Sequence, residues 1–205
     1  MPGSRSLLVS DPETIRIYDD RASDYAALTE DHNAADPALE AFVAALPPGG
    51  RVLDLGCGPG TSAARMAQTG LTVVAVDASG EMVALAARHP GVTARQARFD
   101  EIDETAAYDG IWANFSLLHA PQAEFPGHLA HLFRALKPGG IFHIALKLGT
   151  GEGRDSLGRF YSYYQEDALE HLLQQAGFTI TARSFGAGPG LSGKVEDWIA
   201  MRAHA

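Results

Sequence analysis

The 205-residue chain has very little cysteine: Cys57 is the only one, so no disulfide can form within the chain. Long apolar runs are also missing. Only three apolar residues separate Ser6 from Ser10, too few for a signal peptide, and no stretch approaches the roughly 20 residues that cross a membrane. We therefore expect a cytoplasmic protein without a membrane partner.

Positive charge is scarce as well. The chain carries 16 lysine and arginine residues against 25 aspartate and glutamate residues, a formal net charge of −9. A protein that binds a phosphate backbone needs a basic face, so this balance argues against nucleic acid and favours a small-molecule partner. With 46% hydrophobic residues, one domain with a sizeable core is expected.

The most informative stretch is an apolar run followed by a glycine-rich turn. Residues 52–55 are typical of a strand buried on both faces, and three glycines then alternate with other residues up to position 60. Glycines let the chain turn sharply and let a ligand approach closely. Thr61 or Ser62 is expected to cap a following helix, whose free N–H groups suit an electron-rich ligand.

The details of this turn indicate which ligand it holds. A dinucleotide fingerprint needs a third glycine at the position of Thr61, whereas here it comes one residue early. Asp54, two positions before the first glycine, would repel a pyrophosphate but suits a cationic amino-acid group. Residues 54–60 resemble the first motif of class I S-adenosylmethionine-dependent methyltransferases, which implies cofactor contacts from Asp54, Gly56, Cys57, Gly58, Pro59 and Gly60.

A second acidic residue supports a nucleoside ligand. The apolar run 71–77 ends on Asp77, 17 residues after Gly60, where nucleotide-binding folds place an acid for the two ribose hydroxyls. A structural role at the start of the helix that follows Ser79 is the alternative, and one carboxylate can serve both. Ala78 and Met82 are then expected to flank the adenine.

The family resemblance extends to three further candidate positions. In these methyltransferases an acid after the third strand often accepts the adenine amino group, a role that fits Asp100 next to Phe99. Glu101, Asp103 or a merely solvated loop remain alternatives. Asn114 and Ser116 follow the expected fourth strand, 108–114, at the sheet edge that holds ligands. Residues 114–117 depart from the Asn-Pro-Pro-aromatic signature of base-methylating enzymes, which argues against base methylation.

Tyrosines are expected near the cofactor as well. A helix is predicted to begin at Ser10-Asp11-Pro12, and it carries Tyr18 and Tyr25 at helical spacing. Many small methyltransferases have a similar pair before the first motif. The pair therefore either covers the cofactor or belongs to the core.

Candidate catalytic residues lie in two places. His119 follows the fourth strand and is either a general base, a substrate anchor or a buried histidine bonded to backbone. Residues 147–164 are too rich in glycine and mixed charge to predict a packed element, but they contain Arg159 and Tyr161. This stretch resembles a bacterial subgroup called tellurite-resistance-like and forms either a substrate-side lid or a surface loop. His128 and His131 lack a third ligand, so no metal site is expected.

Together these features predict the fold and the activity. We expect an α/β protein with a Rossmann-like three-layer sandwich: a mostly parallel seven-stranded sheet closed by an antiparallel C-terminal strand pair, 178–185 and 197–203. One domain is predicted over 1–205, with an N-terminal helical cap at 1–48 and a core at 49–205. It is expected to be a monomer or a homodimer.

The predicted activity is in-line methyl transfer from S-adenosylmethionine to a small-molecule acceptor, with S-adenosylhomocysteine as product. Two alternatives share the same motifs. One is an NAD(P)-dependent oxidoreductase, against which the position of Asp54 and the early third glycine argue. The other is a protein that binds S-adenosylmethionine without catalysis.

Overall fold

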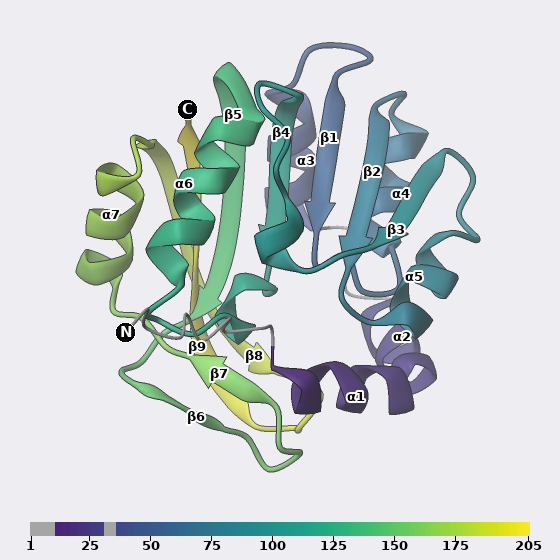
Figure 1. Cartoon of the computed structure of the whole chain (residues 1–205), viewed down its shortest axis with the longest axis vertical. Helices are drawn as coiled ribbons and strands as arrows, with labels where there is room; N and C mark the ends of the chain where they lie inside the picture. Colours follow the sequence, from purple (N-terminus) through teal and green to yellow (C-terminus); the bar gives the residue numbers. More distant parts are fainter. Residues whose placement is uncertain (1–10, 31–35) are drawn as a thin grey trace, which may run out of the picture.

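The computed structural model describes residues 11–30 and 36–205, and these form a three-layer α/β sandwich (Figure 1). A seven-stranded sheet has the order β3-β2-β1-β4-β5-β9-β8, with β9 antiparallel to both of its neighbours. Its strands are β1 (Arg51–Leu55), β2 (Thr72–Asp77), β3 (Val92–Gln96), β4 (Tyr108–Asn114), β5 (Leu136–Lys147), β8 (Thr179–Pro189) and β9 (Val195–His204). The predicted fold class, including the antiparallel closing pair, is confirmed.

Alternate residues of the central strands supply two separate cores. Val52 and Val73 face a layer formed by α3 (Pro37–Ala44), α4 (Thr61–Gln68) and α5 (Gly80–Ala86). Leu53 faces the opposite layer, formed by α6 (Phe125–Ala135) and α7 (Glu166–Gln175). Because both faces are covered, the central strands are mostly apolar, as their sequence predicted, and Asp54 is a buried charged exception in β1.

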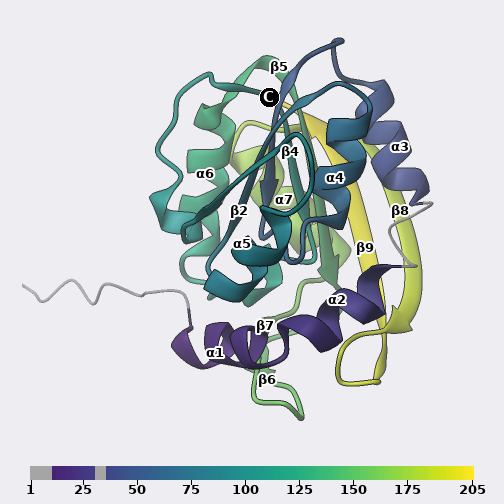
Figure 2. The same ribbon diagram turned by 90° about the vertical axis from the view of Figure 1, so that its right-hand side faces the viewer.

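The remaining elements gather at the carboxyl ends of the parallel strands. α1 (Pro12–Asp20) and α2 (Ala22–Glu30) run across this end of the sheet, next to a two-stranded sheet of β6 (Glu152–Arg154) and β7 (Phe160–Ser162) (Figure 2). Short 3₁₀ turns at Phe99–Glu101 and Leu117–His119 complete this group of elements. In open α/β sheets this is the edge at which ligands bind.

Several local predictions need correction. The single N-terminal helix is two helices, with a break at Arg21; Asp11 caps the first, and Ser10 lies outside the described residues. Gly60, rather than Thr61 or Ser62, is the N-cap of α4.

The prediction that 147–164 lacks a packed element is wrong. This stretch contains β6 and β7, and Arg159, Tyr161 and Ser162 are buried. Contacts from elsewhere in the chain fix it: Thr14 Oγ1 accepts the Phe160 amide over 2.8 Å. A glycine-rich sequence thus becomes ordered through tertiary contacts. Within 11–30 and 36–205, no helix has the length and apolar character needed to span a bilayer.

Candidate active site

The glycine turn between β1 and α4 is held against β2 by its own backbone. The amides of Gly56 and Cys57 both donate to the carbonyl of Val76, over 2.7 and 2.9 Å. Gly56 has a φ of +70°, and a Cβ built there would lie 2.2 Å from the Cβ of Ser116. Only glycine fits here, because the turn passes so close to the end of β4.

Asp77, the last residue of β2, ties this turn to the start of α5. Its Oδ2 accepts the amide of Gly58 and its Oδ1 accepts the amide of Ser79, each over 2.9 Å. Burial raises the pKa of the Asp77 carboxyl, and these two hydrogen bonds oppose the rise. The structural role that the sequence left open is therefore present, and each carboxylate oxygen keeps a lone pair for a ligand.

α1 lies over this region and is bonded to it. Ser79 Oγ donates to Asp19 Oδ1 over 2.6 Å, and the Glu81 amide donates to the same oxygen over 3.3 Å. The rings of Tyr18 and Tyr25 meet edge to face with centroids 5.5 Å apart. The structure thus brings both predicted tyrosines to the glycine turn.

A narrow cavity of about 80 Å³, here called the α1 cavity, lies between α1, the glycine turn and α5. Most of the predicted site residues meet here. Those that line it are Tyr18, Tyr25, Gly56, Gly58, Asp77, Ala78, Met82, Phe99, Asn114, Ser116 and His119. The Ser116 hydroxyl is buried and has no hydrogen-bond partner among the described residues.

A larger cavity of about 400 Å³, the glycine-turn cavity, adjoins the first and shares Tyr25, Gly56, Gly58, Asn114 and Phe115 with it. Three further predicted residues line it: Asp54, Cys57 and Pro59. Asp54 is 3% exposed, and its Oδ2 has no hydrogen-bond partner in the described part of the chain. Burial, assisted by the charge of Asp77, raises the pKa of Asp54 to about 7. An unpartnered buried carboxylate favours a cationic ligand.

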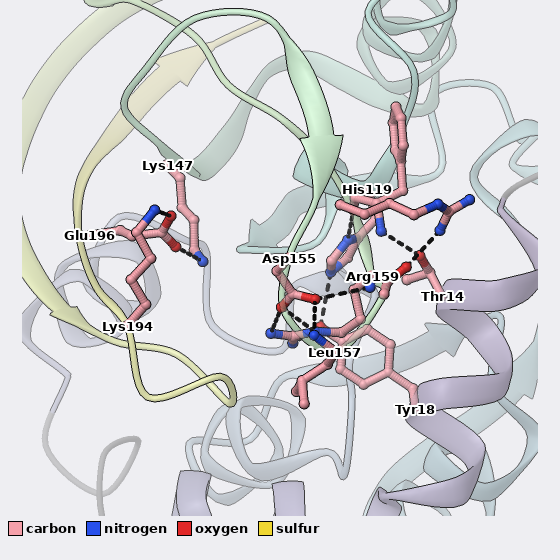
Figure 3. Close-up of polar contacts among 12 residues, drawn as sticks. Thr14, Tyr18, His119, Lys147, Asp155, Leu157, Arg159, Lys194 and Glu196 are labelled. Carbon is pink, nitrogen blue, oxygen red and sulfur yellow. Dashed lines mark hydrogen bonds and ion pairs between the residues drawn. The ribbon is translucent and has the colours of Figure 1, made fainter.

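His119 belongs to a hydrogen-bonded chain that the sequence did not reveal (Figure 3). Its Nδ1 lies 2.6 Å from the carbonyl oxygen of Phe160, and its Nε2 lies 2.9 Å from the Tyr18 hydroxyl. Arg159 Nη1 donates to that same hydroxyl over 2.9 Å. Burial lowers the pKa of His119 to about 4, so the ring is neutral near pH 7.

Arg159 is held from its other side by Asp155. Arg159 is 1% exposed, and its Nε and Nη2 donate to Asp155 Oδ2 over 3.0 and 2.6 Å. The paired carboxylate compensates much of the cost of burying the guanidinium. The predicted catalytic residues His119, Arg159 and Tyr161 therefore lie together, because β7 packs against the turn after β4.

A third cavity, about 440 Å³ in volume, opens between β7, the β8–β9 turn and the two N-terminal helices. We call it the hairpin cavity. Its lining combines charged and aliphatic residues with five aromatic ones: Tyr18, Tyr25, Phe115, Tyr161 and Trp198. Tyr18 lines both this cavity and the α1 cavity, whereas His119 lines only the latter.

The chain is similar to proteins of a known family. A sequence profile described as a methyltransferase domain matches residues 28–183. The chain belongs to the class I S-adenosylmethionine-dependent methyltransferases.

Individual relatives agree with this assignment. An uncharacterized methyltransferase of Synechocystis sp. is 30% identical over 164 residues, which cover 72% of this chain and 75% of that protein. Trans-aconitate 2-methyltransferase of Deinococcus radiodurans is 29% identical over 147 residues, 71% of this chain and 54% of the relative, so the chain spans about half of that protein.

A solved structure is similar as well. The 1,6-didemethyltoxoflavin-N1-methyltransferase of Burkholderia thailandensis, solved with 1,6-didemethyltoxoflavin and S-adenosylhomocysteine, has a TM-score of 0.70 and 26% identity. The match covers 93% of this chain and 87% of that one. Family membership excludes the alternative of an NAD(P)-dependent oxidoreductase.

Two residues predicted to bind the methyltransferase cofactor lie away from the cavities. Gly60 packs the start of α4 against α5, where a Cβ would lie 2.8 Å from the Cα of Ala86. Asp100 is paired with Arg98 over 3.0 Å and lines none of the three cavities. Their proposed cofactor contacts remain predictions.

Sequence reasoning also missed lining residues of the α1 cavity, namely Asp11, Thr14, Ile15, Ser79 and Phe115. The helix-start signal at Asp11 and Pro12 locates the first three at the N-cap and first turn of α1. No sequence pattern predicts that Phe115 lines the cavity, because its φ of +53° is unusual for a residue with a side chain.

Proposed function

We propose that this methyltransferase transfers a methyl group from S-adenosylmethionine to a small-molecule acceptor by in-line displacement. The observation that carries the proposal is that two buried groups near the ends of adjacent strands, Asp54 Oδ2 and Ser116 Oγ, have no hydrogen-bond partner within residues 11–30 and 36–205. Each of these groups destabilises the folded protein while it lacks a partner, and a polar ligand that supplies a hydrogen bond removes that destabilisation. Asp54 in particular suits the ammonium group of an amino acid.

The residues present fit the parts of this cofactor. Asp54 and the glycine turn would hold the cationic amino-acid end, and the free lone pairs of Asp77 would accept the ribose hydroxyls. Ala78, Met82 and Phe99 would flank the adenine, with Tyr18 and Tyr25 as the cover. The α1 and glycine-turn cavities adjoin, so one elongated ligand would use both.

The bound cofactor supplies an electrophilic methyl carbon, and the electron pair of its broken carbon–sulfur bond remains on sulfur. The protein's task is then to hold an acceptor in line with that carbon and to exclude water. The covering helices and the β6–β7 hairpin suit this task, because they lie over the carboxyl edge of the sheet. A small molecule fits the hairpin cavity, and the named relatives act on or bind trans-aconitate and 1,6-didemethyltoxoflavin, which are both small.

Isothermal titration calorimetry tests the cofactor assignment. We expect wild-type protein to bind S-adenosylmethionine and S-adenosylhomocysteine, and Asp77→Ala to lose about 1–3 kcal/mol of binding free energy with the buried acceptor. Asp109→Ala is the matched control, because Asp109 also accepts a backbone amide, that of Arg51 over 2.8 Å, but lines none of the three cavities. Absence of binding by folded wild-type protein would overturn the proposal.

A further inference from the structure

The three cavities of the candidate active site share a common border. Asn114 lines the α1 and glycine-turn cavities, and Tyr18 lines the α1 and hairpin cavities, but neither lines all three. Among the residues that the structure describes, only Tyr25 and Phe115 line every one of them. The three cavities therefore meet at these two aromatic side chains.

This junction matches the branching point of the cofactor. The sulfur of S-adenosylmethionine carries three carbon substituents: the nucleoside, the amino-acid chain and the methyl group. The proposed function assigns the α1 cavity to the nucleoside, the glycine-turn cavity to the amino acid and the hairpin cavity to the acceptor of the methyl group. An atom bonded to all three substituents has to lie where the three cavities meet.

Separate contacts hold the two rings at the junction. The Tyr25 ring packs against the glycine turn, since a Cβ built on Gly58 would lie 3.3 Å from its Cε1, and it meets the Tyr18 ring edge to face. The Phe115 ring meets that of Trp198 on β9, with centroids 6.0 Å apart. Tyr25 and Phe115 are only partly buried, so part of each remains accessible to a ligand.

The backbone of Phe115 is strained. Its φ of +53° lies in the left-handed region that favours glycine. Its amide donates to the carbonyl of Ala145 on β5 over 3.0 Å, which ties the residue to the sheet. Backbone strain of this kind persists where the surrounding structure enforces it, and it is concentrated at functional sites. Glycine would relieve the strain here but would leave no ring at the junction.

We propose that Phe115 and Tyr25 bind the sulfonium group of S-adenosylmethionine and distinguish this cation from the neutral thioether of S-adenosylhomocysteine. The inference rests on the proposed function and adds the residues at the point of methyl transfer. An aromatic ring attracts a cation near its face, whereas a neutral sulfur lacks this electrostatic attraction. The rings thus favour the methyl donor, and the loss of charge on transfer weakens their hold on the product.

The acidic residues of the site act on groups that both ligands share. In the proposed function Asp54 holds the ammonium group and Asp77 holds the ribose hydroxyls, and both groups are present in donor and product. The attraction of these carboxylates for the sulfonium stays the same when only a ring is replaced. A ring that contacts the sulfonium therefore alters the difference in affinity between the two ligands.

Calorimetric titration of the full chain with both ligands tests the inference. Phe115→Leu keeps an apolar side chain but removes the ring. It should weaken the binding of S-adenosylmethionine about 5–30-fold and leave the affinity for S-adenosylhomocysteine nearly unchanged. Phe99→Leu is the matched control, because Phe99 is also partly buried but lines only the α1 cavity of the three. Its loss of affinity should be equal for the two ligands, since they share the adenine.

Tyr25 provides an independent test, which also covers the case that Phe115→Leu does not fold. Tyr25→Leu should weaken the binding of S-adenosylmethionine far more than that of S-adenosylhomocysteine. Tyr25→Phe keeps the ring and should restore the wild-type difference in affinity between the ligands. This comparison separates the ring from its hydroxyl group.

The possible results distinguish the inference from the function on which it rests. Equal losses for both ligands in Phe115→Leu and Tyr25→Leu would contradict the inference, because the rings would then contact a part that the ligands share. Unchanged affinity for S-adenosylmethionine in both variants would contradict it as well. If folded wild-type protein binds neither ligand, the proposed function fails instead.

Discussion

Gly56→Ala should lower the free energy of unfolding by about 3 kcal/mol or more and abolish measurable cofactor binding. A Cβ at this position would lie 2.2 Å from the Cβ of Ser116, so either the turn or the end of β4 must shift. Overpacking of this kind costs about 1–3 kcal/mol, and a side chain at φ +70° adds roughly 1–2 kcal/mol. Urea denaturation and calorimetric titration measure the two losses.

Two further variants separate the clash from the backbone strain. Gly49 has nearly the same φ, +71°, but nothing lies within 4 Å of a Cβ built there. Gly49→Ala should therefore lose only the strain contribution. The double variant Gly56→Ala/Ser116→Gly removes the clashing atom and should recover part of the stability in a double-mutant cycle. Equal losses in Gly49→Ala and Gly56→Ala would contradict the argument from steric contact.

The central sheet was predictable because local signals there agree. Apolar runs bounded by glycine or acidic residues marked β1, β2 and β4, and parallel strands place their carboxyl ends at one edge. This brought Asp54, Asp77 and Asn114 to adjacent strand ends, as expected. The prediction succeeded for segments whose own residues determine their secondary structure.

The structure of residues 147–164 was not predictable, because long-range contacts hold this segment in place. Arg154 Nη2 donates to Asp11 over 2.8 Å across 143 residues. This hydrogen bond lowers the pKa of Asp11 to about 2, although partial burial opposes the shift. No periodicity marks such a pair. The hairpin sequence therefore predicted a loop, while its partners on α1 gave it order.

His119 shows how two sequence interpretations can describe one residue. The sequence left open a general base or a buried histidine bonded to backbone. In the structure the bond to Phe160 is present, and it sets the tautomer that leaves Nε2 free to accept from Tyr18. The backbone contact is therefore present, and the role of His119 as a general base stays a prediction.

Asp54→Asn should stabilise the ligand-free protein at alkaline pH while weakening cofactor binding. Burial raises the folded-state pKa of Asp54 from 3.8 to about 7. The folded protein holds the Asp54 proton more tightly than the unfolded chain does, and this contributes to the free energy of unfolding below pH 3.8. The contribution is lost as the pH rises through 7, since the folded state must then hold an unfavourable buried charge. Asparagine removes this cost, and its carbonyl can still accept from the Ala63 amide.

The expected difference between variant and wild type grows with pH. At about 1.4 kcal/mol per pH unit, Asp54→Asn should gain roughly 2–4 kcal/mol over wild type between pH 5 and pH 8, measured by urea denaturation. Asp109→Asn is the opposite control: burial alone would raise the pKa of Asp109, but Lys137 at 2.8 Å holds it low. That variant should lose stability at pH 8.

The affinity for the cofactor should change in the opposite direction to the stability, both with rising pH and in Asp54→Asn. The charge that destabilises the ligand-free protein is then the charge that binds the cofactor. Wild-type protein must ionise Asp54 to hold an ammonium group, so its affinity for S-adenosylmethionine should rise between pH 6 and 8. Asp54→Asn should bind roughly 10–100-fold more weakly at pH 8, because a charged hydrogen bond is lost, with little pH dependence of its own. If the variant gains stability but keeps wild-type affinity at every pH, the cationic group lies elsewhere and Asp54 is only a strained core residue.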